Sequence, residues 1–144
     1  MAILRETPYL TRNFRVELSG SGTLAGGFCE VIFPEFVVKA PAKGRAQAVQ
    51  LSGSPNLILR RGVQGSLDLY AWFDEERRRP TGSRARRRRD LRVALLNEDH
   101  SAEVLTWRFI GVRPVRLGYA PLQSMASEVL IESIELEFER MEME

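Results

Sequence analysis

The chain has 144 residues and a mass of 16.4 kDa, with 44% hydrophobic and 28% charged residues, as in one ordinary folded domain spanning residues 1–144. Its longest apolar run covers residues 69–73, whereas a membrane-spanning helix needs roughly 20 residues, so we expect no membrane insertion. The apolar stretch at the N-terminus is too short for a secretory signal, so we expect assembly in the cytoplasm. The net charge is +2, and the single cysteine excludes an internal disulfide.

Two segments near the N-terminus have the pattern of strands. In residues 13–18, Phe14, Val16 and Leu18 alternate with polar residues, which predicts a half-buried strand. A stretch rich in glycine and serine, residues 19–27, separates it from a second apolar segment at residues 28–33. The two segments together predict a hairpin or a meander.

Residues 34–55 contain two apolar pieces but no clear core pattern. We predict a long extended hairpin arm, because loops beyond about 12 to 15 residues are uncommon in a compact domain unless they have a function, here reaching another subunit. The alternative is a mobile surface loop. The apolar and basic residues that we place at an assembly interface in this stretch are Phe36, Val37, Val38, Lys39, Lys43, Arg45, Val49 and Leu51.

One helix is predicted, after a short strand at residues 56–60. Ser66 is expected to cap it, Asp68 lies in its first turn, and arginines from Arg77 onwards lie in its last turn, before a stop at Pro80. The apolar residues of the first two turns should be buried. They are Leu67, Leu69, Tyr70, Trp72 and Phe73.

The C-terminal half predicts further strands. Residues 91–96 and 103–112 should pair antiparallel around a polar turn at residues 97–102, and Pro114 should end the second strand because proline cannot donate to the ladder. In residues 129–139 the apolar side chains change phase, so we predict a bulge or bend near Ser133. The fold class is mainly β, a small β-barrel or sandwich of six or seven strands with one helix.

Two motifs suggest chemistry, but each has a simpler interpretation. Residues 20–25 match the dinucleotide pattern G-x-G-x-x-A, yet a strand and not a helix follows, so we interpret them as a flexible turn. His100, the only histidine, lies among polar residues between two strands, which is typical of a hairpin turn and not of a catalytic triad. Cys29 is expected to be a small buried residue. We predict no catalytic residue, no metal and no cofactor.

Charge is strongly polarised along the chain. From Arg77 to Arg92 there are nine arginines and one acid, a local charge of 9 − 1 = +8, whereas the last seventeen residues contain seven glutamates. One interpretation is a nucleic-acid-binding module that uses this cluster, although no aromatic residue interleaves it. The other is contact between copies of the chain through opposite charges. The candidates for such a contact are Arg86, Arg87, Arg88, Arg89, Glu135, Glu137 and Glu139.

Several segments, taken in order, resemble the tail-tube (inner tube) protein family of contractile phage tails and phage-derived contractile injection systems. They include Pro8-Tyr9 with residues 13–18, residues 27–31, Leu59-Arg60-Arg61-Gly62-Val63 with Trp72, residues 93–98, Trp107-Arg108-Phe109 with Pro114, and residues 127–136. The resemblance covers nearly the whole chain.

This resemblance implies a structural, non-enzymatic protein. Such proteins form hexameric rings that stack into a hollow tube inside a contractile sheath, a conduit for DNA or effector delivery. The implied partners are copies of the chain itself, the sheath, baseplate and cap proteins of the same particle, and an effector or DNA cargo. The particle is a phage virion tail or an injection particle. Residues 34–55 correspond to the hairpin that lines the lumen and contacts neighbouring rings.

Overall fold

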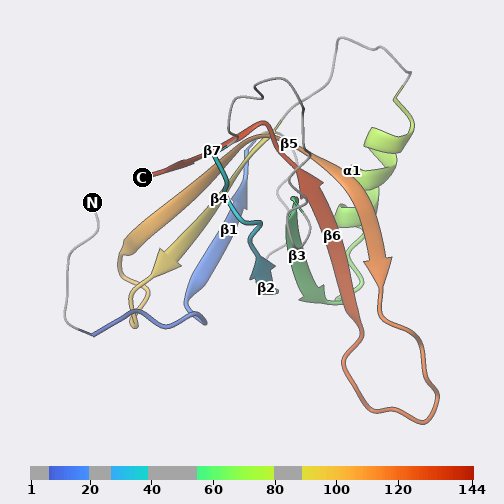
Figure 1. Cartoon of the computed structure of the whole chain (residues 1–144). Coiled ribbons are helices and arrows are strands. Elements are labelled where there is room, and N and C mark those ends of the chain that lie inside the picture. Colours follow the sequence, from blue (N-terminus) through green and yellow to red (C-terminus); the bar gives the residue numbers. More distant parts are fainter. Residues whose placement is uncertain (1–6, 20–26, 39–54, 80–88) are drawn as a thin grey trace.

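A computed structural model describes residues 7–19, 27–38, 55–79 and 89–144. Within these ranges the chain forms seven strands and one helix, which confirms the mainly β fold class (Figure 1). The elements are β1 (Phe14–Leu18), β2 (Phe28–Ile32), β3 (Leu57–Gly62), α1 (Asp68–Arg77), β4 (Arg89–Leu96), β5 (Glu103–Tyr119), β6 (Ile131–Glu137) and β7 (Arg140–Met143).

The strands form two sheets that share the long strand β5. Its first half pairs with β4 on one side and β7 on the other, and β4 pairs with β1. Its second half pairs with β6, which continues through β3 to β2. All pairs are antiparallel. Figure 1 shows the two sheets diverging from β5, as in an open sandwich.

The prediction that Pro114 ends a strand was wrong, because β5 continues to Tyr119. Proline lacks the N–H that a regular ladder needs, and here the register shifts between Pro114 and Arg116 as the strand pairs with β6. A bulge of this kind tolerates the missing donor. Nearby, Gly111 adopts a positive φ of 70°, which few other residues accept.

The prediction that the first two strands pair with each other was also wrong. β1 pairs with β4, where Glu17 lies opposite Arg92, and β2 pairs with β3, where Glu30 lies opposite Arg60. Both pairs form ion pairs, at 3.0 and 3.1 Å between the charged atoms. Opposite charges facing each other across a ladder favour these partners. The alternating pattern located each strand but did not identify its partner.

The core lies between the sheets and under α1, which packs against β5. Its fully buried side chains include Leu59, Leu91, Phe109 and Ile134, with Leu69 from the helix. Core residues of this size each contribute roughly 1.5–3 kcal/mol by burial. The large apolar side chains therefore come from both sheets and the helix, as expected for one domain.

The helix is present as predicted, with differences at its start. The N-cap position is Leu67 and not Ser66, and no side chain caps it. The Ser66 hydroxyl instead accepts a bond from the Asp68 amide at 3.3 Å. The buried helical face is also narrower than predicted, because Leu67 and Tyr70 are exposed and only Leu69 and Trp72 are fully covered.

No bulge occurs in β6 near Ser133, so that prediction was wrong too. The strand alternates regularly, and its pairing with β3 shows no shift in register. The inward positions are Glu132, Ile134 and Leu136, whereas Ile131 lies on the other face. The apolar side chains change face between Ile131 and Ile134 without a bulge, because a glutamate occupies the inward position 132, where it pairs with Arg61.

The polar turn at residues 97–102 is confirmed. The Asn97 amide donates to the Ala102 carbonyl at 3.2 Å, and His100 sits in the turn with φ 59°. Cys29, by contrast, is exposed on β2, so the expectation of a buried cysteine was wrong. It lies where the β2–β3 register shifts, between Phe28 and Glu30. The glycine-rich residues 20–25 lie outside the described ranges.

Candidate assembly surfaces

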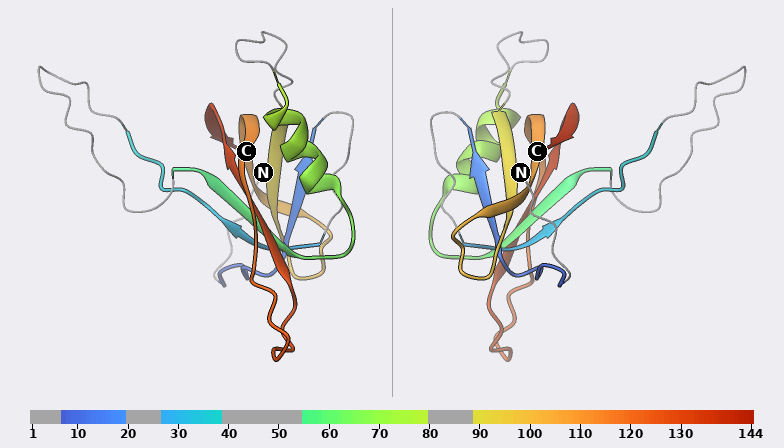
Figure 2. Two further views of the ribbon diagram at one scale, coloured as in Figure 1. Left: turned by 90° about the vertical axis from the view of Figure 1, so that its right-hand side faces the viewer. Right: turned by 90° about the vertical axis from the view of Figure 1, so that its left-hand side faces the viewer.

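The start of the predicted arm extends from the body of the molecule. After β2, residues 33–38 form no strand, and Figure 2 shows them running away from the sheets. Phe36 remains near the core, with its ring centroid 6.4 Å from that of Phe109 and 6.5 Å from that of Phe138. Val37 is half-exposed and Val38 is 94% exposed. This segment therefore presents apolar side chains away from the core.

The other predicted interface residues of this stretch lie outside the described ranges. They are Lys39, Lys43, Arg45, Val49 and Leu51, and the same holds for Arg86, Arg87 and Arg88 of the arginine cluster. Their part in assembly stays a prediction.

Arginines of the cluster that lie in the described ranges pair with acids of the same chain. Arg78 lies 2.9 Å from Asp74, and Arg89 lies 3.9 Å from Glu75 with its guanidinium 5.9 Å from the centre of the Trp72 ring. Arg77, Arg79 and Arg92 are likewise paired, with carboxylates of the helix or of neighbouring strands. The positive charge of these residues is thus compensated within the chain.

The predicted acids of the C-terminal segment also have partners within the chain. Glu135 accepts a hydrogen bond from the Asn56 amide at 3.3 Å and lies 4.0 Å from Arg116. Glu137 pairs with Arg113. Glu139 follows β6, and its amide donates to the Ile110 carbonyl at 2.9 Å. Their predicted contact with the arginines of another copy would have to compete with these pairs.

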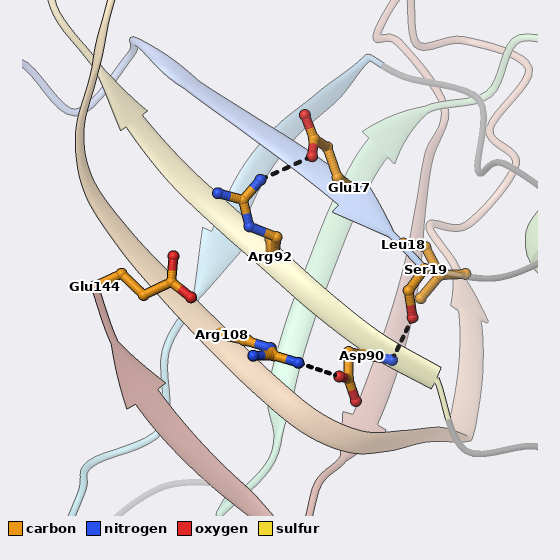
Figure 3. Close-up of a pocket in the computed structure, with 7 residues that line it drawn as sticks. All are labelled: Glu17, Leu18, Ser19, Asp90, Arg92, Arg108 and Glu144. Carbon is orange, nitrogen blue, oxygen red and sulfur yellow. Dashed lines mark hydrogen bonds and ion pairs between the residues drawn. The ribbon is translucent and has the colours of Figure 1, made fainter.

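A network of opposite charges covers the outer face of the β1–β4–β5–β7 sheet. Arg92 lies 3.0 Å from Glu17, and Arg108 lies 2.9 Å from Asp90 (Figure 3). Arg92 also lies 3.1 Å from Glu103. Glu103 also accepts a hydrogen bond from Arg15. The hydrogen bonds from Arg15 and Arg92 lower the pKa of Glu103, although burial acts to raise it. The face is therefore polar and largely neutralised. Sequence analysis missed it, although the alternation of charge in the outward positions was visible.

An apolar groove opens between the two sheets at their β1 and β2 sides. We call it the edge groove; it has a volume of about 710 Å³. It exists because β1 and β2 are outer strands of their sheets, so that their inward side chains meet no further strand in the described part of the chain. The residues that line it are Tyr9, Leu10, Thr11, Arg12, Phe14, Phe28, Cys29, Glu30, Val31, Phe33, Val93, Leu95 and Trp107.

A buried charge cluster joins α1 to both β3 and β6. Arg61 is 1% exposed; its Nε donates to Glu132 at 2.6 Å and its guanidinium pairs with Asp68. The hydrogen bond with Asp68, aided by that with Glu132 and opposed by burial, raises the pKa of Arg61. The ring of Phe28 lies under the guanidinium at 5.5 Å. The cluster fixes the start of the helix against the sheet.

The described residues show neither a metal-binding cluster nor a membrane-spanning helix. No group of three or more histidine, cysteine, aspartate or glutamate side chains there could hold a metal ion. Among the same residues, no helix is both long and apolar enough to cross a membrane.

Comparison with known proteins identifies the family. The sequence profile described as T4-like virus tail tube protein gp19 matches residues 10–142. A comparison with curated proteins finds no match.

Three solved structures share the fold. A chain of the sheath-tube complex of the extracellular contractile injection system PVC, in the extended state, is 20% identical, with TM-score 0.72 over 96% of this chain and 93% of that chain. A chain of the six-fold symmetrised anti-feeding prophage (AFP) baseplate is 25% identical, with TM-score 0.67 over 97% of both chains. Hcp1 from Flavobacterium johnsoniae is 16% identical, with TM-score 0.59 over 91% and 94%. The chain therefore belongs to the T4-like virus tail tube protein gp19 family, as a structural tail tube protein.

Proposed function

We propose that this tail tube protein closes into six-membered rings and that the rings stack into a hollow tube inside a contractile sheath. The tube would be assembled in the cytoplasm and serve as a conduit for DNA or an effector. Sheath, baseplate and cap proteins of the same particle are its proposed partners. The observation that carries the proposal is the agreement of fold and sequence, over 97% of both chains, with a protein of a six-fold symmetrised baseplate.

The arrangement of the sheets supports assembly through their edges. β1, β2 and β7 each pair with a single strand among the described residues, and the second half of β5 pairs only with β6 there. Free sheet edges favour indiscriminate pairing between chains. Ring closure removes this problem when the edge of one subunit meets the edge of the next.

The exposed residues after β2 support a role in contacts between subunits. Phe36 anchors the segment on the core while Val38 is almost fully exposed, so the apolar surface faces away from the molecule. Exposed apolar surface of this kind marks interaction sites. We propose that this segment, the residues that follow it and the arginine and glutamate candidates contribute to assembly, and that no residue is catalytic.

The ion pairing of the arginine cluster argues against the nucleic-acid-binding alternative. A protein that neutralises phosphates needs cations that are available to them. The described members of the cluster, such as Arg78 and Arg89, instead pair with carboxylates of the same chain.

Electron microscopy and sedimentation of the purified chain test the proposal. Negatively stained samples over a range of concentrations should show six-fold rings or stacked tubes, and sedimentation velocity should show the corresponding large species. Val38→Asp should weaken assembly by about tenfold or more, because it places a charge in an apolar contact. Leu67→Asp, at the exposed N-cap position before the helix, is the control. A wild-type chain that stays monomeric at every concentration, with or without preformed baseplates, contradicts the proposal.

A further inference from the structure

The connection between β5 and β6 is an ordered loop with an apolar surface. Residues 120–130 are held at their base by a hydrogen bond from the Ala120 amide to the Ile131 carbonyl at 2.9 Å, and at the turn by one from Ala126 to Gln123 at 3.1 Å. We call residues 121–129 the hairpin tip. Figures 1 and 2 show that it projects beyond the sheets.

The hairpin tip exposes large apolar side chains to an unusual degree. Leu122 is 85% exposed, Met125 is 98% exposed, and Val129 is also exposed. Clustered exposure of this kind on an ordered loop marks a contact surface. The core of the described part of the chain does not use these side chains, which leaves them available for a contact between copies.

The edge groove has the complementary shape and chemistry. It is concave and lined mainly by aromatic and aliphatic side chains, among them Phe14, Phe28 and Trp107. Pockets of this kind accept protruding apolar anchors and contribute most of the energy of an interface.

Topology keeps the hairpin tip and the edge groove apart on the chain. The second sheet runs β5–β6–β3–β2, so β2, which lines the groove, is one edge strand, whereas the hairpin tip extends from the ends of β5 and β6 at the other side of that sheet. Two different surfaces that complement each other bind copies head to tail, and such contacts generate rings when the rotation closes.

Charge adds a second complementarity. Arg12 lies on the rim of the groove. The other arginines in the described part of the chain form ion pairs there, whereas Arg12 forms none. Glu128, on the hairpin tip, likewise has no ion-pair partner among the described residues. Both side chains are exposed, so each is available to the other across a contact between copies.

We infer that the hairpin tip of one copy inserts into the edge groove of its neighbour, with Met125 and Leu122 as apolar anchors and Glu128 facing Arg12. The inference rests on the proposed function and specifies the contact within a ring. It pairs β5–β6 of each subunit with the β1–β2 edge of the next.

Charge exchange tests the polar part of the contact. Arg12→Glu and Glu128→Arg should each weaken assembly by about tenfold or more in sedimentation velocity, because each places like charges together. The double variant restores opposite charges and should assemble within about threefold of the wild type. Met125→Asp should weaken assembly at least as much as either single change, whereas Leu67→Asp, at the 71% exposed N-cap position, should have no effect. Circular dichroism should show that each monomer stays folded, since all these side chains are exposed.

Cross-linking tests the location directly. Cys29 lies in the edge groove and is the only cysteine of the chain, so Met125→Cys creates one new reactive site. A short bismaleimide should then link copies into a ladder that ends at the closed ring, and Leu67→Cys should give no ladder. If the wild type forms rings, the charge variants assemble as well as the wild type, and no cross-linked ladder appears, this contact is overturned. The proposed function would then still stand. Failure of the wild-type chain to form rings would overturn both.

Discussion

Replacement of Arg61 should destabilise the fold more than replacement of its neighbour Arg60. Arg61 is 1% exposed and is the charged partner of Glu132, which is 3% exposed, and of Asp68. In Arg61→Met, Glu132 loses its guanidinium partner and stays buried with a negative charge. Breaking a buried ion pair from one side typically costs about 3–5 kcal/mol of unfolding free energy.

The matched control is Arg60→Met on the same strand. Arg60 is exposed and lies 3.1 Å from Glu30, an exposed pair worth at most about 1 kcal/mol. Urea denaturation of dilute protein, followed by circular dichroism and the fluorescence of the two tryptophans, measures both free energies. The dependence of free energy on urea should be unchanged, so that the midpoints can be compared directly.

A double variant separates charge from packing. Arg61→Met with Glu132→Leu removes the two most buried charges and fills their place with apolar side chains. Asp68 stays, but it is less buried and lies in the first turn of the helix, so the double variant should recover most of the loss. If Arg61→Met cost no more than Arg60→Met, or if the double variant were less stable than the single one, the assignment of a buried charge cluster would be incorrect.

Three further predictions concern the core, the shared strand and pH. Leu69→Ala should cost about 2–5 kcal/mol in the same denaturation assay, because the side chain is fully buried; a loss below 1 kcal/mol would mean that the helix does not pack there. Gly111→Ala should destabilise by more than about 1 kcal/mol, since φ is 70° and a Cβ would lie 2.8 Å from the Glu139 carboxyl carbon, and an unchanged midpoint would contradict this backbone conformation. The hydrogen bond from Arg15 lowers the pKa of Glu103, so the stabilisation is present above the ordinary glutamate value and is lost as pH falls through the lowered pKa. Glu103→Gln should therefore flatten the acid side of the stability profile, and an unaltered profile would show that the pairing is not formed in solution.

Local patterns in the sequence were sufficient to predict most elements. Alternation in residues 13–18 predicted β1, and the charges around Asp68 and Arg77 predicted α1 with nearly correct ends. These signals lie within a few residues of each other, so a single segment contains them. The resemblance to tail-tube proteins, which depends on the order of such segments, was confirmed by the family comparison.

Features that depend on distant residues were beyond these patterns. A bulge near Ser133 was predicted in place of a buried Glu132, because the burial of Glu132 requires Arg61, which is 71 residues away in sequence. The edge groove arises from the strand order, and the order brings together distant segments such as β1 and β4, where Glu17 meets Arg92, 75 residues away. No local period encodes such contacts. They become visible only when the strands have been paired.

The shared strand β5 also has a mechanical consequence. Because one covalent backbone runs through both sheets, a load on one sheet reaches the other along the chain and not only through side-chain packing. The sheets cannot slide past each other without bending the backbone near Gly111 and Pro114, where a residue with a wide range of φ is followed closely by one with a fixed φ. A subunit built in this way resists shear as a single body. In the proposed tube of stacked rings, this stiffness would keep the shape of each subunit constant under an axial load.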